Sequence, residues 1–162
     1  MQLLVTLQII VLVFVANGAP VIAKRLWGQR LSYPIDCGVE FFDGQRLLGP
    51  SKTIRGVLSS ILVTSACTPL VGLDWKIGVV VGSAAMAGDS FSSFVKRRLG
   101  LPPSSRATGL DQVPESLFPL LSCRSMLALT VADIAMGVAL FFVGEIVLSR
   151  LLYRLRVRGH PY

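Results

Sequence analysis

The chain has 162 residues, of which 52% are hydrophobic and 15% are charged, with a mean hydropathy of +0.66 and a net charge of +7. Charged residues make up about a quarter of an average soluble protein, and a soluble globule of this length could not hide so much apolar surface. The absence of repeats, the little polar sequence and the three cysteines exclude collagen-like, disordered and disulfide-stapled chains. The composition therefore indicates an integral membrane protein.

Several stretches are apolar enough to cross a bilayer as helices, which takes about 20 residues. The predicted spans cover residues 3–23, 57–73, 77–95 and 126–152. A shorter apolar stretch, residues 113–123, contains two prolines and is either a fifth, partly broken span or a re-entrant segment. Residues 3–23 do not resemble a signal peptide, because the apolar run is too long and no basic residue precedes it.

The basic residues favour the five-span alternative. All of them except Lys76 and Arg124 lie between residues 24 and 56, between 96 and 112, or from 150 onward. These segments share one side of the membrane only if residues 113–123 cross it, as the positive-inside rule requires. We therefore predict one all-α bundle over residues 1–162 with about five transmembrane helices in the cell (inner) membrane. The N-terminus is outside, and the long loop 24–56, the loop 96–112 and the tail 153–162 are cytosolic.

One acidic residue inside a predicted span suggests a site. Charge at the bilayer centre costs roughly 2.5–3.5 kcal/mol on the mildest scale, and Asp89 lies inside the third span. Gly78, Gly82, Ala85 and Asp89 recur at spacings of four, three and four, so they share a helix face that should pack closely on another helix. Asp89 then points into the bundle, where it is either salt-bridged to Lys96 or part of a metal or proton site.

Two further acids lie in the last predicted span, and their roles stay open. Asp133 is near the outer end, where it is solvated, paired with Lys76 or Arg124, or functional. Glu145 is near the cytosolic end, where Arg150 is within reach as a structural partner. For each, a structural and a functional role are both alternatives, because membrane acids serve in either way.

The loop before the second span is where polar chemistry concentrates. Residues 34–56 contain three acids, three basic residues and four glycines. Basic side chains and glycine-exposed amides suit a polyphosphate ligand. The alternative is that these charges only fix topology and touch anionic headgroups, although Asp36, Glu40 and Asp43 would be repelled there. The GxxxxGK[ST] spacing of a Walker A loop is missing.

Four ordered motifs resemble those of the CDP-archaeol synthase family, which is related to CDP-diacylglycerol synthases. The first is Val15-Ala16-Asn17 with Pro20, in the first predicted span. The second comprises three segments of the long loop: Pro34-Ile35-Asp36-x-Gly38, Asp43-Gly44-x-Arg46-x-Leu48-Gly49 and Lys52-Thr53-x-Arg55-Gly56. The third is Gly88-Asp89 with Ser93 and Lys96-Arg97, and the fourth is Leu110-Asp111-Gln112. The chain departs from the family motifs at two of these places. Pro50-Ser51 replaces an acidic element of the family loop, and the second acid of the L-D-Q-x-D pattern is displaced to Glu115.

This resemblance implies a membrane transferase that joins CTP to a lipid phosphate in phospholipid biosynthesis, giving a CDP-lipid and pyrophosphate. It implies Mg²⁺ as the cofactor, and the expected partners are CTP, the lipid phosphate and membrane lipids, without nucleic acid and with a homo-oligomer left open. The rival interpretation is a non-enzymatic transporter or assembly factor with an anion-binding cytosolic face. A third keeps the chemistry but uses a different lipid phosphate.

The same resemblance assigns roles to individual residues. Asp89 and Asp111 are expected to hold the metal, because Mg²⁺ prefers carboxylate oxygens together with phosphates. The expected phosphate clamps are Lys52, Arg55, Lys96 and Arg97. The residues expected to bind nucleotide are Asp36, Asp43, Arg46, Lys52 and Ser93, with Asp36 and Asp43 alternatively ordering the loop.

Overall fold

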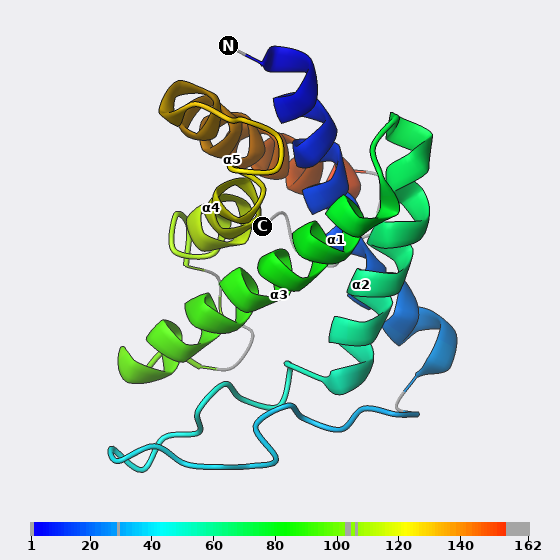
Figure 1. Ribbon diagram of the computed structural model, residues 1–162. Helices are drawn as coiled ribbons and strands as arrows, with labels where there is room; N and C mark the ends of the chain where they lie inside the picture. Colours follow the sequence, from blue (N-terminus) through cyan, green and yellow to red (C-terminus); the bar gives the residue numbers. More distant parts are fainter. Residues whose placement is uncertain (1, 29, 103–104, 106, 155–162) are drawn as a thin grey trace.

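The computed structural model describes residues 2–28, 30–102, 105 and 107–154. Within these residues the ordered elements are helices, and no strand occurs apart from two isolated bridges (Figure 1). In chain order the elements are α1 (Leu3–Trp27), α2 (Ile54–Cys67), the short 3-10 helix η1 (Thr68–Val71), α3 (Trp75–Arg98), α4 (Gln112–Ser122) and α5 (Val131–Arg154). The all-α prediction is confirmed, whereas the tail predicted over 153–162 lies outside the described residues from position 155 onward.

Four segments of the described chain are long and apolar enough to cross a membrane: Leu3–Trp27, Ile54–Val71, Trp75–Arg98 and Val131–Arg150. The predicted fifth segment is the helix α4, but it has only 11 residues. At about 1.5 Å per residue it is roughly half as long as the hydrocarbon core is thick. The helix therefore cannot cross the bilayer by itself, and the number of crossings stays a prediction.

The start of the last helix differs from its predicted position at residue 126. Asp133 accepts hydrogen bonds from the Thr130 backbone N–H (3.0 Å) and hydroxyl (2.7 Å), and from the Gln2 backbone N–H (2.8 Å). Ala128 just before it has a positive φ of 49°, which a continuing helix does not allow. Asp133 is thus fully buried as a cap that ties α5 to the start of α1, and the alternatives of solvation or pairing with Lys76 or Arg124 are wrong.

The small-residue face of α3 packs closely on another helix, as its spacing predicts. A Cβ atom at Gly78 would lie 2.1 Å from the Thr68 hydroxyl, and one at Gly82 would lie 3.0 Å from the Ile61 Cα, both at the α2–η1 side. Gly88 meets the other neighbour, since a Cβ there would lie 2.2 Å from the Pro114 carbonyl oxygen of α4. Helix α3 is therefore held between α2 and α4 by glycines.

The apolar core lies where α1, α3, α4 and α5 meet. Its fully buried members include Ile9, Leu12, Val81, Leu120 and Phe141. Many other large apolar side chains point outward from the helices, among them Leu4, Ile22, Leu62 and Val143. Such exposure fits helices whose outer surface faces lipid.

The loop between α1 and α2 is folded back on itself. Its two ends pair through hydrogen bonds from Ile35 N to Lys52 O (2.8 Å) and from Ile54 N to Tyr33 O (3.0 Å). Its middle forms a small hairpin in which Phe41 N donates to Gln45 O (2.8 Å). In Figure 1 this loop, drawn in cyan, runs beneath the ends of α2 and α3.

Candidate functional site

A cavity of about 650 Å³ lies where the end of α1, the end of the loop, the start of α2 and the middle of α3 meet. Part of its wall is polar and includes Lys24, Ser51, Lys52, Arg55 and Asp89. Another part is apolar and includes Pro20, Val21, Val57 and Met86. The cavity therefore offers charged groups and an apolar surface to the same ligand.

The polar wall is organised by an ion pair between Lys52 and Asp89. Their side chains are 17% and 26% exposed, so a substrate can reach them. Thr53 places Lys52 directly before α2, because its hydroxyl caps that helix by accepting from Gly56 N (3.2 Å). Asp89 thus points into the bundle as predicted, but the alternative of a salt bridge with Lys96 is wrong.

Arg55 lines the same cavity and also joins two helices. Its Nη1 donates to the carbonyl oxygens of Gly28 (2.8 Å) and Arg30 (2.6 Å), at the end of α1. Both carbonyls follow the last residue of α1, where no further helical turn supplies donors, so a buried guanidinium is a fitting donor. Arg55 therefore fixes the end of α1 against the start of α2 at the rim of the cavity.

Glu115 on α4 is a site residue that sequence reasoning missed. Its Oε2 accepts a hydrogen bond from Asn17 Nδ2 on α1 (3.0 Å), and its carboxyl is close enough to Asp89 for the two acids to interact electrostatically. The Gly88–Pro114 contact brings α3 and α4 close enough for this. The only signal in the sequence was that Glu115 follows the motif position where the family has its second acid.

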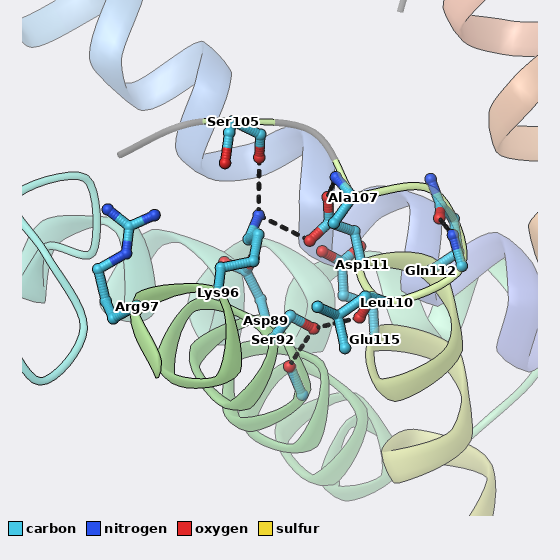
Figure 2. A network of polar contacts seen from close by, with 12 residues as sticks. Asp89, Ser92, Lys96, Arg97, Ser105, Ala107, Leu110, Asp111, Gln112 and Glu115 are labelled. Atoms are coloured by element: carbon cyan, nitrogen blue, oxygen red, sulfur yellow. Dashed lines mark hydrogen bonds and ion pairs between the residues drawn. The ribbon is translucent and has the colours of Figure 1, made fainter. Parts of the chain in front are cut away.

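Lys96 and Asp111 form a second ion pair, with 2.7 Å between Nζ and Oδ1, away from the cavity lining (Figure 2). The Lys96 ammonium also donates to Ser105 O (3.0 Å), and Asp111 Oδ2 accepts from Ala107 N (3.0 Å). Their side chains are only 10% and 16% exposed. This pair fastens the loop between α3 and α4 onto α3.

Two other predicted residues of α3 are buried near that second pair. Arg97 donates from Nη2 to Pro102 O (2.7 Å), and its side chain lies next to the backbone of Gly49 in the first loop. Ser93 is buried one turn earlier, and like Arg97 it does not line the cavity. The structure thus groups Lys52, Arg55 and Asp89 together, and it holds Lys96, Arg97 and Asp111 against the second loop.

Asp36 orders the first loop. Its carboxylate accepts from the backbone N–H groups of Gly38 (3.1 Å), Leu48 (3.2 Å) and Gly49 (2.8 Å), and it is 4% exposed. Burial acts to raise the pKa of this carboxyl, but the three N–H donors and the nearby positive charge of Arg46 together bring the pKa below its ordinary value. Asp36 and Arg46 therefore shape the loop rather than line the cavity.

The far tip of the loop is held by Arg98, which the sequence analysis did not single out. Its Nε lies 3.1 Å from Asp43 Oδ2, and its Nη2 donates to Arg46 O (2.9 Å). The guanidinium lies 4.6 Å from the Phe41 ring centre and 5.1 Å from that of Phe94, which are cation–π distances. Asp43 therefore anchors the hairpin to the end of α3.

An apolar helical bundle with a part-cationic, part-apolar cavity fits the class of membrane proteins that bind a phosphorylated lipid. The family model of CarS-like CDP-archaeol synthases matches residues 1–79 and 65–162. The chain is 33% identical over 154 residues to the CDP-archaeol synthase of Sulfurisphaera tokodaii, covering 91% of this chain and 89% of the relative. It is 38% identical over 109 residues to that of Pyrococcus furiosus, covering 61% and 62% of the two chains.

A solved structure gives the same result. It is described as an intramembrane enzyme for archaeal membrane lipids biosynthesis, and it matches with a TM-score of 0.77 at 30% identity, covering 90% of this chain and 93% of the other. The chain belongs to the CDP-archaeol synthase family. It is an integral membrane protein and a CTP-dependent cytidylyltransferase of lipid biosynthesis, which confirms the resemblance seen in its motifs and favours it over the transporter alternative.

The family implies a divalent metal, and the residues at the cavity fit one. No group of three or more His, Cys, Asp or Glu side chains that could hold a metal occurs in the part of the chain that the structure describes. Mg²⁺ is commonly bound through only one or two carboxylates, with substrate phosphates and water completing its shell. Asp89 supplies one such carboxylate at the cavity wall, and Glu115, which interacts electrostatically with Asp89, is the nearest second candidate on α4.

Proposed function

We propose that this chain transfers the cytidylyl group of CTP to the phosphate of an archaeol-type ether lipid and releases pyrophosphate. The observation that carries the proposal is the mixed wall of the cavity, where Lys52, Arg55 and Asp89 face the same space as Pro20 and Val57. A phosphate joined to an apolar chain needs both surfaces in one place. The relatives from Sulfurisphaera tokodaii and Pyrococcus furiosus, both named CDP-archaeol synthases, support the same lipid.

The chemistry is an in-line displacement at phosphorus. An oxygen of the lipid phosphate attacks the α-phosphorus of CTP, and the bond from that phosphorus to the oxygen bridging the β-phosphorus breaks as pyrophosphate leaves. Repulsion between the two polyanions is the main obstacle, so fixed positive charge provides most of the catalysis. Lys52 acts as a point charge, while Arg55 can engage two oxygens at once. An ionised phosphate needs no protein base.

Mg²⁺ is the proposed metal, and it would supply charge neutralisation between the two sets of phosphates. Asp89, which is paired with Lys52, would hold it, and Glu115, which interacts electrostatically with Asp89, would be a second ligand. Asp111, the other ligand proposed from the motifs, has Oδ1 paired with Lys96 and Oδ2 engaged by Ala107 N. Asp111 would therefore join the metal only after that ion pair opens, and Lys96 would then be released to bind a phosphate.

Lys96 and Arg97 remain proposed phosphate clamps, and Asp36, Asp43, Arg46 and Ser93 remain proposed nucleotide-binding residues. The position of Arg97 supports a shared role with the loop between α1 and α2. Its side chain lies against Gly49 of that loop, and the Gly49 backbone N–H donates to Asp36. A nucleotide that approaches from the water on the loop side would meet the loop between α1 and α2 before it meets the cavity. A homo-oligomer stays open.

The proposed topology has five crossings, with the N-terminus outside and the loops in the cytosol, where CTP is. At one end of the bundle Gln2 binds Asp133 and Gln8 binds Val71 O (2.6 Å). At the other end Arg55 binds Gly28 O, and Lys96 binds Asp111. The chain therefore passes from one end of the bundle to the other between Asp111 and Asp133. This supports a fifth crossing made by α4 together with the turn that follows it.

The experiment uses purified protein in lipid nanodiscs with Mg²⁺ and CTP radiolabelled on the α-phosphate. Ether-linked isoprenoid, ether-linked saturated and ester-linked lipid phosphates are offered separately, and label entering the organic phase is counted. Transfer to the isoprenoid ether lipid supports the proposal. Transfer only to ester lipids replaces the proposed substrate, and no transfer to any lipid by folded protein contradicts the activity.

A further inference from the structure

The three cations that line the cavity differ in what they already bind. Lys52 is paired with Asp89, and Arg55 donates to the carbonyls of Gly28 and Arg30. Lys24 lines the same cavity, but among the described residues its ammonium has no hydrogen-bond or ion-pair partner. The protein thus places one uncommitted positive charge at the cavity.

The position of Lys24 on α1 connects it to the apolar wall. Pro20 and Val21, four and three residues earlier, line the cavity too, so Lys24 continues the same face of the helix. Its neighbours Ile22 and Leu26 point outward with large exposed fractions, as expected next to lipid. Lysine at the end of a membrane helix extends its ammonium to the level of the lipid headgroups. Lys24 therefore stands where the apolar and charged parts of the cavity meet.

The other charged groups of the cavity lie on different elements. Lys52 belongs to the loop and Asp89 to the middle of α3, whereas Lys24 belongs to the last turn of α1. A lipid reaches the cavity from the bilayer, along helix surfaces, and its phosphate meets the cation at the end of such a surface first. CTP comes from water and meets the loop.

We propose that Lys24 binds the phosphate of the lipid acceptor, and that Pro20, Val21, Val57 and Met86 receive the first part of its apolar chains. This inference rests on the proposed function and assigns a specific residue to one of its two substrates. The competing roles of Lys24, a topology-fixing charge or a ligand of CTP, predict different kinetics.

The test compares Lys24→Ala, Lys24→Arg and the matched control Lys76→Ala in nanodiscs. Lys76 is at the start of α3, where its backbone N–H binds Asp74 and its side chain does not line the cavity. A hydrogen bond to a charged group contributes about 1.5–3 kcal/mol, so Lys24→Ala should raise KM for the lipid phosphate about tenfold or more. KM for CTP should stay within about twofold. Lys24→Arg should restore most of the lipid KM, and Lys76→Ala should change neither constant.

Three results would overturn the inference: a rise in KM for CTP instead of lipid, unchanged constants in Lys24→Ala, or the same loss in Lys76→Ala. If Lys24→Ala does not accumulate, Lys24→Gln keeps most of the stem and removes the same charge. Equilibrium binding of a radiolabelled lipid phosphate to detergent-solubilised protein, wild type against variant, tests Lys24 without turnover. Equal binding contradicts the inference, whereas a lack of turnover in the wild type contradicts only the proposed function.

Discussion

Two lysine–aspartate pairs connect α3 to its neighbouring loops, and they differ in what surrounds them. Lys52 reaches Asp89 from the first loop at the wall of the cavity. Lys96 reaches Asp111 in the second loop, where Ser105 O and Ala107 N occupy further bonding positions of the pair. A substrate phosphate can replace one partner in the first pair at little cost. The second pair can open only if the loop rearranges, so the same two side-chain types are accessible in one place and committed to loop attachment in the other.

Removing the acid of the cavity pair should have the largest effect. Asp89→Asn keeps the size of the side chain but removes the charge that would hold a divalent cation, so transfer of label from CTP to lipid should fall by a factor of about a hundred or more. The variant should remain folded in detergent, as judged by gel filtration and thermal unfolding. Asp74→Asn, at the other end of α3, is the control. Full activity in Asp89→Asn would remove this residue from the site.

Reversing the second pair should separate loop attachment from metal binding. Lys96→Ala or Asp111→Asn should lower activity about tenfold and speed proteolysis between residues 99 and 111, because one charge of a poorly exposed pair loses its partner. The double variant Lys96→Asp with Asp111→Lys should regain loop protection but little activity, because the proposed metal and phosphate roles need each charge in its own position. Regained activity as well would show that the pair serves loop attachment alone.

Loosening the loop tip should have a smaller effect. Arg98→Ala removes the contacts to Asp43, Phe41 and Phe94, so hydrogen exchange between residues 40 and 47 should become faster. KM for CTP should rise a few-fold, because a less ordered hairpin weakens the binding free energy by about 1 kcal/mol, while kcat changes little. Arg98→Lys should recover the ion pair but not the ring contacts. The loop clamp is contradicted if exchange in this hairpin is unchanged.

The smallest effect is expected from Asp36, and the pH dependence of that effect identifies its cause. The folded-state pKa of Asp36 lies below its ordinary value of 3.8, so the charged form stabilises the loop. That stabilisation is complete above the ordinary pKa and is lost as the pH falls through the folded pKa. Asp36→Asn should therefore exchange amide protons of residues 48 and 49 faster than wild type at pH 7, and the difference should shrink in acid below pH of about 4. A difference that grows in acid would contradict this account.

Periodicity and apolar runs were enough to predict most helices and the packing face of α3. Gly78 and Gly82 have no side chains, so a neighbouring helix can approach the backbone of α3 closely there, and α2 does so. The partner of Asp89 was not predictable in this way, because Lys96 on the same helix and Lys52 in a distant loop are equally plausible until the loop is folded. The motifs identified both Lys52 and Lys96 as candidate site residues, but only the tertiary contacts show that Lys52 is the partner of Asp89.

Glu115 and Asp133 are two acids whose environments could not be predicted from the sequence. The first lies near the site unexpectedly, and the second has a capping role that was not considered. Glu115 is on a short helix with two prolines, and its place beside Asp89 depends on the close approach of α3 and α4 at Gly88. Asp133 is an acid in an apolar run, yet it is a helix cap because Thr130 precedes it and Gln2 is folded against it. Acids in membrane helices cannot be assigned from sequence when their partners are distant along the chain.

The double hydrogen bond from Arg55 to the end of α1 has a mechanical consequence. It joins α1 and α2 three residues after Lys52, so the two helices and that end of the loop must move together. Membrane helices change their tilt with the thickness of the bilayer. A change in bilayer thickness that tilts one of these two helices is therefore expected to carry the other helix, and Lys52 with it.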